Sequence, residues 1–271
     1  MSCASGRGRR PRLNKTGPQY LVANGRRLEY RWIPPQHRGK PPLVLLHEGL
    51  GSAELWRDFP DRLAARTGGG ALVYSRYGYG RSDVLGGPRN IHYLEHEALT
   101  SLPAVLAALR IGFPVLVGHS DGASIALIHA ADGRWPVRGL VLEAPHVFVE
   151  DVTIRGIIGA RESYESGPMR EKLRPWHTDV DATFNGWADV WLQPGFRAWN
   201  IERHLPGIRC PTLVIQGEDD RYGTSAQVEA IQRGSGAPVE ALVLPGCGHA
   251  PHAERPEEVL DAMARFVEAL A

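Results

Sequence analysis

The sequence predicts an α/β fold with a mostly parallel sheet flanked by helices, and three observations support this. Short apolar runs typical of strands alternate with helical patterns in both halves of the chain. Such alternation favours parallel strands joined by covering helices. The alternation stops only between about His146 and Arg209, where tryptophan, glycine and scattered charges replace it. Because long structureless loops are rare in compact domains, this interruption predicts a helical insertion.

The expected strands and helices follow one another in order along the chain. Strand-like runs are expected at 28–32, 43–47, 71–75, 115–117, 140–143, 212–216 and 241–244. Helical patterns are expected at 55–66, 93–109, 123–131, 225–233 and 256–269. The last helix has Pro256 near its start and one apolar stripe, so it should pack on the sheet without a chemical role.

Composition indicates an ordinary soluble enzyme rather than a nucleic-acid or membrane binder. The 271 residues contain 31 Lys+Arg and 30 Asp+Glu, so no global field attracts nucleic acid or an anionic membrane. A small-molecule substrate is the expected partner, and the sequence does not indicate an oligomeric state. Three cysteines without paired or metal-ligand spacing suit a reducing compartment. No stretch approaches the length of a membrane span, so we expect a cytoplasmic location.

The domain organisation follows from the same patterns. Residues 1–17 are rich in arginine, glycine and serine without a following apolar core, which predicts a disordered basic tail rather than a secretory signal. Residues 18–145 and 210–271 should form the α/β core. Residues 146–209 should form a helical cap, or lid. Most of its tryptophans should form the core of this cap, and at least one should face the substrate.

The most informative motif is Gly-His-Ser-Asp-Gly at residues 118–122, with an apolar run before it and a small-residue helical pattern after it. This predicts a strand, a tight turn and a helix with Ser120 at the apex. The flanking glycines remove the Cβ clashes of so sharp a turn, so the hydroxyl can stand exposed above the sheet edge. Ser120 is therefore the expected nucleophile.

A serine hydroxyl is a poor nucleophile, so it needs a base and an acid that orients the base. His249 lies between glycine and proline after the last strand, where it is the expected base. Asp219 and Asp220 follow the preceding strand. Asp220 is preferred as the acid because its position, three residues after the glycine, lets the loop turn back toward His249. Glu143, at the end of an earlier strand, is the fallback.

An attacked carbonyl becomes an oxyanion that needs preorganised donors. The backbone N–H of Asp121, directly after the nucleophile, should supply one donor. The glycine-containing turn after the strand at 43–47 should supply the second, through the amide of Gly49 with Glu48 as its rival. Within the substrate pocket we expect His146, Trp187 and Trp191. The proposed chemistry requires neither a metal nor an organic cofactor.

Together these motifs resemble the α/β-hydrolase superfamily, specifically the capped serine hydrolases of esterase, lactonase and C–C hydrolase type. The resemblance covers most of the chain and rests on four blocks: 47–52, 75–82, 118–122 and 248–256. It implies an α/β-hydrolase fold with the family's nucleophile, acid and base at Ser120, Asp220 and His249. Two positions depart from the pattern. Glu48 replaces a frequent glycine, and Asp121 replaces a frequent hydrophobic residue.

These departures bring carboxylates to the expected catalytic edge. A negative side chain there opposes the developing charge unless it is paired or turned away. We favour a paired Asp121. The alternative is an acidic rim, with Glu143 as a further member, that discourages anionic substrates and prefers neutral or cationic esters.

The expected activity is hydrolysis of a small carboxylic ester or lactone through an acyl-Ser120 intermediate. Alternatives with the same triad are thioester cleavage and C–C hydrolysis of a vinylogous diketone, the latter favoured by a positively charged lid pocket. Another is a ligand receptor with negligible turnover. Epoxide hydrolases and haloalkane dehalogenases of this fold use an aspartate nucleophile, whereas the apex of this turn presents Ser120. Positive charge in the lid could come from Arg155, Arg161, Arg170 and Arg174.

Overall fold

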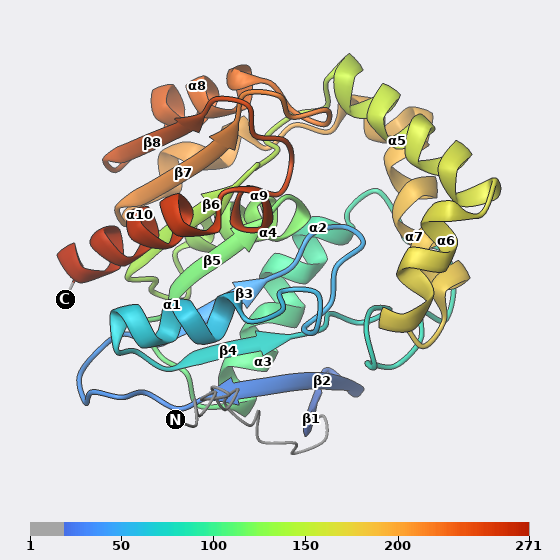
Figure 1. Cartoon of the computed structure of the whole chain (residues 1–271). Coiled ribbons are helices and arrows are strands. Elements are labelled where there is room, and N and C mark those ends of the chain that lie inside the picture. Colours follow the sequence, from blue (N-terminus) through green and yellow to red (C-terminus); the bar gives the residue numbers. More distant parts are fainter. Residues whose placement is uncertain (1–18, 271) are drawn as a thin grey trace, which may run out of the picture.

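The computed structural model describes residues 19–270, which form an eight-stranded sheet with helices on both faces (Figure 1). The strand order is β1-β2-β4-β3-β5-β6-β7-β8. In this order, neighbouring strands from β4 to the far edge at β8 are parallel, β3 included. At the other edge, β1 pairs antiparallel with β2, and β2 pairs antiparallel with β4. The predicted fold class is thus confirmed. The strands are β1 (Gln19–Ala23), β2 (Arg26–Ile33), β3 (Leu43–Leu46), β4 (Ala71–Tyr74), β5 (Val115–His119), β6 (Gly139–Glu143), β7 (Thr212–Gly217) and β8 (Val239–Leu244).

The first strand, β1, was not predicted from the sequence. It forms a hairpin with β2 through Asn24 and Gly25, whose φ angles are 48° and 68°. Asn-Gly is the preferred pair for a two-residue hairpin turn with two positive φ angles. This dipeptide was therefore the available signal for the missing strand.

Alternate residues of the central strands face opposite sides of the sheet, and each side has its own apolar core. Val44 and Leu46 of β3 belong to one core, and Leu43 and Leu45 belong to the other. The first face is covered by α3 (Leu102–Ala108), α4 (Asp121–Asp132) and α8 (Ser225–Gly234), and the second by α1 (Phe59–Thr67) and α10 (Pro256–Ala269). Between β4 and β5 lie also α2 (Tyr93–His96) and a π-helical turn, η1 (Glu97–Ser101).

The predicted helix at 55–66 begins later than expected, at Phe59. Pro60 lies in its first turn, where the missing N–H of proline has no cost. The residues before it form turns. A short helix after β8, α9 (Pro251–Glu254), was also not predicted.

The segment between β6 and β7 is helical, and Figure 1 shows α5, α6 and α7 beside the carboxyl ends of the central strands. The last element of the segment, η4, instead packs against α4 and α8 on the sheet's face. The boundaries at 146 and 209 remain predictions, and the basic tail at 1–17 lies outside the described residues. The elements are α5 (Asp151–Glu165), α6 (Pro168–Leu173), η2 (Arg174–Trp176), α7 (Val180–Leu192), η3 (Pro194–Ala198) and η4 (Glu202–Gly207).

Every helix within residues 19–270 is too short or too polar to cross a membrane.

Candidate active site

Ser120 occupies a strained turn between β5 and α4. Its φ and ψ angles are 52° and −116°, a backbone conformation that residues with side chains rarely adopt. The two flanking glycines permit this turn. A Cβ on Gly118 would lie 2.4 Å from the carbonyl oxygen of Gly122, and one on Gly122 would lie 2.0 Å from that of Leu46. The strand and helix therefore approach more closely than any other residues would allow.

Of the three side chains predicted from separate parts of the chain, His249 lies within hydrogen-bond distance of both Ser120 and Asp220. His249 Nε2 lies 3.0 Å from Ser120 Oγ. His249 Nδ1 lies 2.9 and 2.8 Å from the two carboxylate oxygens of Asp220. Each residue follows the carboxyl end of a strand, namely β5, β7 and β8, so the parallel sheet brings them to one edge.

Asp220 is held in place by further donors. Gln216 Nε2 donates to Oδ2 at 2.9 Å, and the backbone N–H of Tyr222 donates to Oδ1 at 2.8 Å. Burial by itself would raise the pKa of Asp220, but the hydrogen bond and charge of His249 hold it below the ordinary value. Asp220 therefore stays an anion that only accepts hydrogen bonds.

The two alternative acids lie elsewhere. Asp219 is exposed to solvent, whereas Asp220 is buried. Glu143 is fully buried, but its Oε2 accepts from the backbone N–H and Nδ1 of His252, each at 2.9 Å, and not from His249. Of the three candidates, Asp220 is the one that lies within hydrogen-bond distance of His249.

Gly49 and Asp121 carry the two backbone amides that the sequence predicts as oxyanion donors. The N–H groups of Gly49 and Asp121 donate to no protein acceptor within residues 19–270, and both residues line the cavity beside Ser120. Asp121 opens α4, where the first N–H groups of a helix have no partner inside the helix. The rival amide of Glu48 likewise donates to no other residue of the described chain, so the geometry leaves both candidates in place.

The cavity beside Ser120 has a volume of about 220 Å³ and a mostly apolar and aromatic wall. His146, Trp187 and Trp191, the three pocket residues predicted from sequence, all line it. The structure adds residues that the sequence did not single out: Leu50, Thr153, Ile157, Tyr222 and Ala250, together with His119. Thr153 and Ile157 lie four positions apart on α5, which places them on one face of that helix.

None of the cavity-lining residues is a lysine or an arginine. Of the four arginines considered as a source of positive charge, Arg155 is exposed. The other three pair with carboxylates elsewhere in the insertion, as Arg161 with Asp189, Arg170 with Asp181 and Arg174 with Glu171.

His146 contributes a neutral imidazole to the cavity wall. Burial, followed by the charge of His249, lowers the pKa of His146 to about 4. Its ring centre lies 5.3 Å from that of Trp191, edge to face. His146 Nδ1 is buried without a hydrogen-bond partner among the described residues. The ring therefore forms part of the cavity wall without carrying a charge.

The carboxylate of Asp121 lies among buried polar side chains. The Tyr93 hydroxyl donates to Asp121 Oδ2 at 2.7 Å and accepts from Trp191 Nε1 at 2.8 Å. Burial raises the pKa of Asp121, and the guanidinium of Arg76, 3.7 Å away, opposes this rise. The favoured expectation of a paired Asp121 matches this arrangement.

The other two carboxylates near the site also have cationic or hydrogen-bonding partners. Glu48 Oε2 lies 3.5 Å from His119 Nδ1, and Glu143 is bonded to His252. His119 Nε2 in turn lies 2.7 Å from the carbonyl oxygen of His249. The proposed acidic rim is therefore a set of paired groups.

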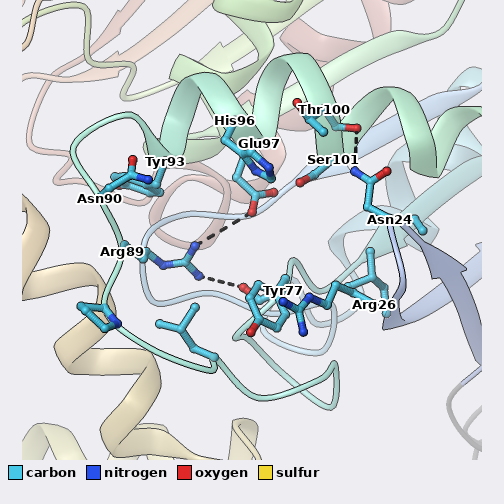
Figure 2. A pocket seen from close by; sticks show the side chains of 14 residues that line it. Asn24, Arg26, Tyr77, Arg89, Asn90, Tyr93, His96, Glu97, Thr100 and Ser101 are labelled. Carbon is cyan, nitrogen blue, oxygen red and sulfur yellow. Dashed lines mark hydrogen bonds and ion pairs between the residues drawn. The ribbon is translucent and has the colours of Figure 1, made fainter.

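A second cavity, of about 350 Å³, lies between the β1–β2 hairpin and the segment of α2 and η1 (Figure 2). Arg89 projects from one side of it, donating from Nη2 to the Tyr77 carbonyl at 2.7 Å, with Nη1 3.9 Å from Glu97 (Figure 2). Neither Ser120 nor His249 lines this cavity. The described residues also contain no cluster of three or more His, Cys, Asp or Glu placed to hold a metal ion.

Comparison with known proteins identifies the family. A profile of the alpha/beta hydrolase family matches residues 43–262. The chain belongs to the alpha/beta hydrolase family. This alpha/beta hydrolase is 29% identical over 262 residues to the pimeloyl-acyl-carrier protein methyl ester esterase of Xanthomonas campestris pv. campestris, covering 85% of this chain and 96% of that protein. Family membership and such relatives support a hydrolase.

Other similarities are partial or structural. The chain is 34% identical over 112 residues to a proline iminopeptidase of Lactiplantibacillus plantarum. The matched segment is 41% of this alpha/beta hydrolase and only 38% of the length of that relative. The crystal structure of VinJ superposes with a TM-score of 0.70 at 26% identity, over 94% of this chain and 99% of VinJ.

Proposed function

We propose that this alpha/beta hydrolase is a serine hydrolase that cleaves a small, uncharged carboxylic ester through an acyl-Ser120 intermediate. One observation carries the proposal. Asp220, His249 and Ser120 form a continuous line of hydrogen bonds that ends at the cavity, with distances of 2.8 and 3.0 Å. A line of this kind is what activates a serine hydroxyl.

The roles of the three side chains follow from their hydrogen-bonding capacity. Because the Asp220 carboxylate only accepts, His249 Nδ1 carries a proton and Nε2 is left as the acceptor for the Ser120 hydroxyl. Ser120 Oγ attacks the ester carbonyl as its proton passes to His249 Nε2. His249 then gives this proton to the leaving alcohol, next takes one from the water that attacks the acyl-enzyme, and returns it to Ser120 Oγ as the acid is released.

The backbone amides of Gly49 and Asp121 would bind the oxyanion that forms on the substrate carbonyl. Donors that point at this oxygen before the reaction begins contribute most of the stabilisation, since they need no reorganisation. The helix dipole of α4, whose N-terminus lies at Asp121, adds to the positive potential.

The cavity favours a small substrate without charge. Its volume of about 220 Å³ lies below the usual range of pockets for larger ligands. No lysine or arginine lines it to pair with a substrate carboxylate, which removes the support for a diketone acid as substrate. The relative from Xanthomonas campestris is named for a methyl ester substrate, and this favours an ester; a lactone would meet the same groups.

Labelling with a fluorophosphonate tests the proposal. We expect a single modification at Ser120, found by peptide mass spectrometry, and none in Ser120→Ala. Ser120→Ala should fold and lose turnover of chromogenic acyl esters, whereas Ser166→Ala, at an exposed serine, should retain it. A Ser120→Ala protein with most of its activity would refute the mechanism.

Steady-state kinetics separate the enzyme from a receptor with the same fold. A hydrolase should release chromophore from a chromogenic acetate continuously after any burst. A receptor would stop after one equivalent. A panel of acyl chain lengths, with matched lactones and thioesters, would then measure the pocket.

A further inference from the structure

Arg76 is a fully buried cation beside the proposed oxyanion site, and the mechanism above does not use it. It follows β4 by two residues, and its side chain is 0% exposed. Burying an unpaired charge is costly, so a buried arginine needs compensating partners. The partners of Arg76 belong to the two loops that supply the candidate oxyanion donors.

The first partner is the loop after β3. Arg76 Nη2 donates to the carbonyl oxygens of His47 at 3.2 Å and Glu48 at 3.0 Å. The Glu48 carbonyl also faces His47 Nδ1 at 2.7 Å and accepts from the Gly51 N–H at 3.1 Å. Three donors therefore fix the direction of this one carbonyl group.

Fixing the Glu48 carbonyl also fixes the Gly49 amide, because both belong to one peptide unit. A trans peptide is planar, and its C=O and N–H point in opposite directions. With its oxygen turned toward Arg76, the unit turns the Gly49 N–H to the other side. Gly49 lines the cavity, and its N–H is unbonded within residues 19–270.

The second partner is Asp121, whose N–H is the other candidate donor. Asp121 Oδ2 lies 3.7 Å from Arg76 Nη2, and both side chains are at least 99% buried. Without a cation, this carboxylate would stand one residue from the nucleophile and oppose the negative charge of the oxyanion. Arg76 offsets that charge where solvent cannot.

We propose that Arg76 is a positioning residue that holds both halves of the oxyanion hole and neutralises Asp121. It does not touch the substrate. It orients the Gly49 amide through the Glu48 carbonyl and keeps the Asp121 carboxylate from opposing the transition state. The proposal rests on the serine hydrolase function proposed above.

Arg89 provides a matched control. Its guanidinium and that of Arg76 both lie over the ring of Tyr79, at 4.8 and 4.6 Å, and the Arg89 side chain is only 6% exposed. Arg89 donates to the Tyr77 carbonyl instead of the oxyanion loop (Figure 2). Arg89→Lys therefore perturbs the same aromatic packing but leaves the contacts of Arg76 in place.

The experiment compares Arg76→Met, Arg76→Lys and Arg89→Lys in the full chain. The fraction of competent protein is measured by end-point fluorophosphonate labelling. The value of kcat is expressed per labelled site, and KM is measured in the same assays. We expect Arg76→Met to lower kcat by roughly 10²-fold, the scale of losing one oxyanion donor, with little change in KM. Arg76→Lys should recover part of the loss, and Arg89→Lys should keep kcat near that of the wild type.

Affinity for a trifluoromethyl ketone gives a readout that packing alone would not move. Its adduct with Ser120 carries an oxyanion, so Arg76→Met should weaken its binding by a factor similar to the fall in kcat. Adding Asp121→Asn to Arg76→Met should restore part of kcat, since it removes the uncompensated carboxylate and keeps the backbone N–H.

The proposal fails if Arg76→Met keeps the kcat and ketone affinity of the wild type per labelled site, if Arg89→Lys loses as much, or if Asp121→Asn gives no recovery. These outcomes differ from a failure of the proposed function, which would appear as unlabelled Ser120 and an active Ser120→Ala protein.

Discussion

The indole of Trp187 lies directly against Gly49, so that a Cβ at position 49 would stand 2.1 Å from Trp187 Nε1. Trp187 belongs to α7 of the helical insertion, and Gly49 belongs to the loop after β3. The insertion therefore packs against the backbone unit proposed to bind the oxyanion. Only glycine allows this approach.

We expect Gly49→Ala to lower kcat/KM by roughly 10²-fold or more, because the methyl group must displace either Trp187 or the amide that stabilises the oxyanion. Steady-state hydrolysis of a chromogenic ester measures the loss, with circular dichroism to check folding. Gly159→Ala is the control, since a Cβ there meets nothing within 4 Å. Equal activity of the two variants would contradict the placement of Gly49.

Replacing the two buried acids separately should show which one serves His249. Asp220→Asn should lower kcat/KM by about 10⁴-fold, because the NH2 group of the amide can donate to Nδ1 and so favours the wrong tautomer of His249, and because the amide has no charge to stabilise the imidazolium. Glu143→Gln should change kcat/KM far less, because Glu143 is bonded to His252 and not to His249. A larger loss in Glu143→Gln than in Asp220→Asn would reverse the assignment.

Much of this arrangement could be predicted because strand ends are visible in the sequence. Ser120, Asp220 and His249 each follow an apolar run, and a parallel sheet brings the carboxyl ends of its strands to one edge. The glycines around Ser120 indicated the sharp turn, and in the structure a Cβ at Gly118 or Gly122 would clash with backbone atoms. The local sequence favoured Asp220 over Asp219, and in the structure Asp220 is buried whereas Asp219 is exposed.

Side-chain pairings between distant segments could not be predicted in this way. Arg76 looks like any polar residue after a strand, and only the packing of three loops turns it into a buried cation beside Asp121. The cavity wall formed by Thr153 and Ile157 depends on how α5 is rotated over the sheet. The helical pattern alone does not fix that rotation.

Matched esters of different charge should show a preference for the neutral substrate. An anionic ester finds no lysine or arginine in the cavity wall, and a cationic ester finds Asp121 and Glu48 already paired. A buried charge without a partner is costly, so both charged substrates should have lower kcat/KM than the neutral one. If the cationic ester were the best substrate, the acidic-rim alternative would be favoured.

His119 should make the stability of the protein depend on pH above neutrality. Burial by itself would lower the pKa of His119, but the hydrogen bond and charge of Glu48, with the charge of Glu143, raise it to about 9. The ordinary value is about 6.5, so the folded state holds this proton more tightly than the unfolded state. The resulting stabilisation is complete below about pH 6.5 and is lost as the pH rises toward 9.

Urea unfolding at a series of pH values measures this loss. For the wild type we expect the free energy of unfolding to fall by roughly 1–3 kcal/mol between about pH 6.5 and pH 9.5. Glu48→Gln removes the charge that raises the pKa of His119, so its stability should change less over the same interval. Glu54→Gln, at an exposed position in the following turn, should behave as the wild type does. Parallel curves for Glu48→Gln and the wild type would show that Glu48 does not hold the proton on His119.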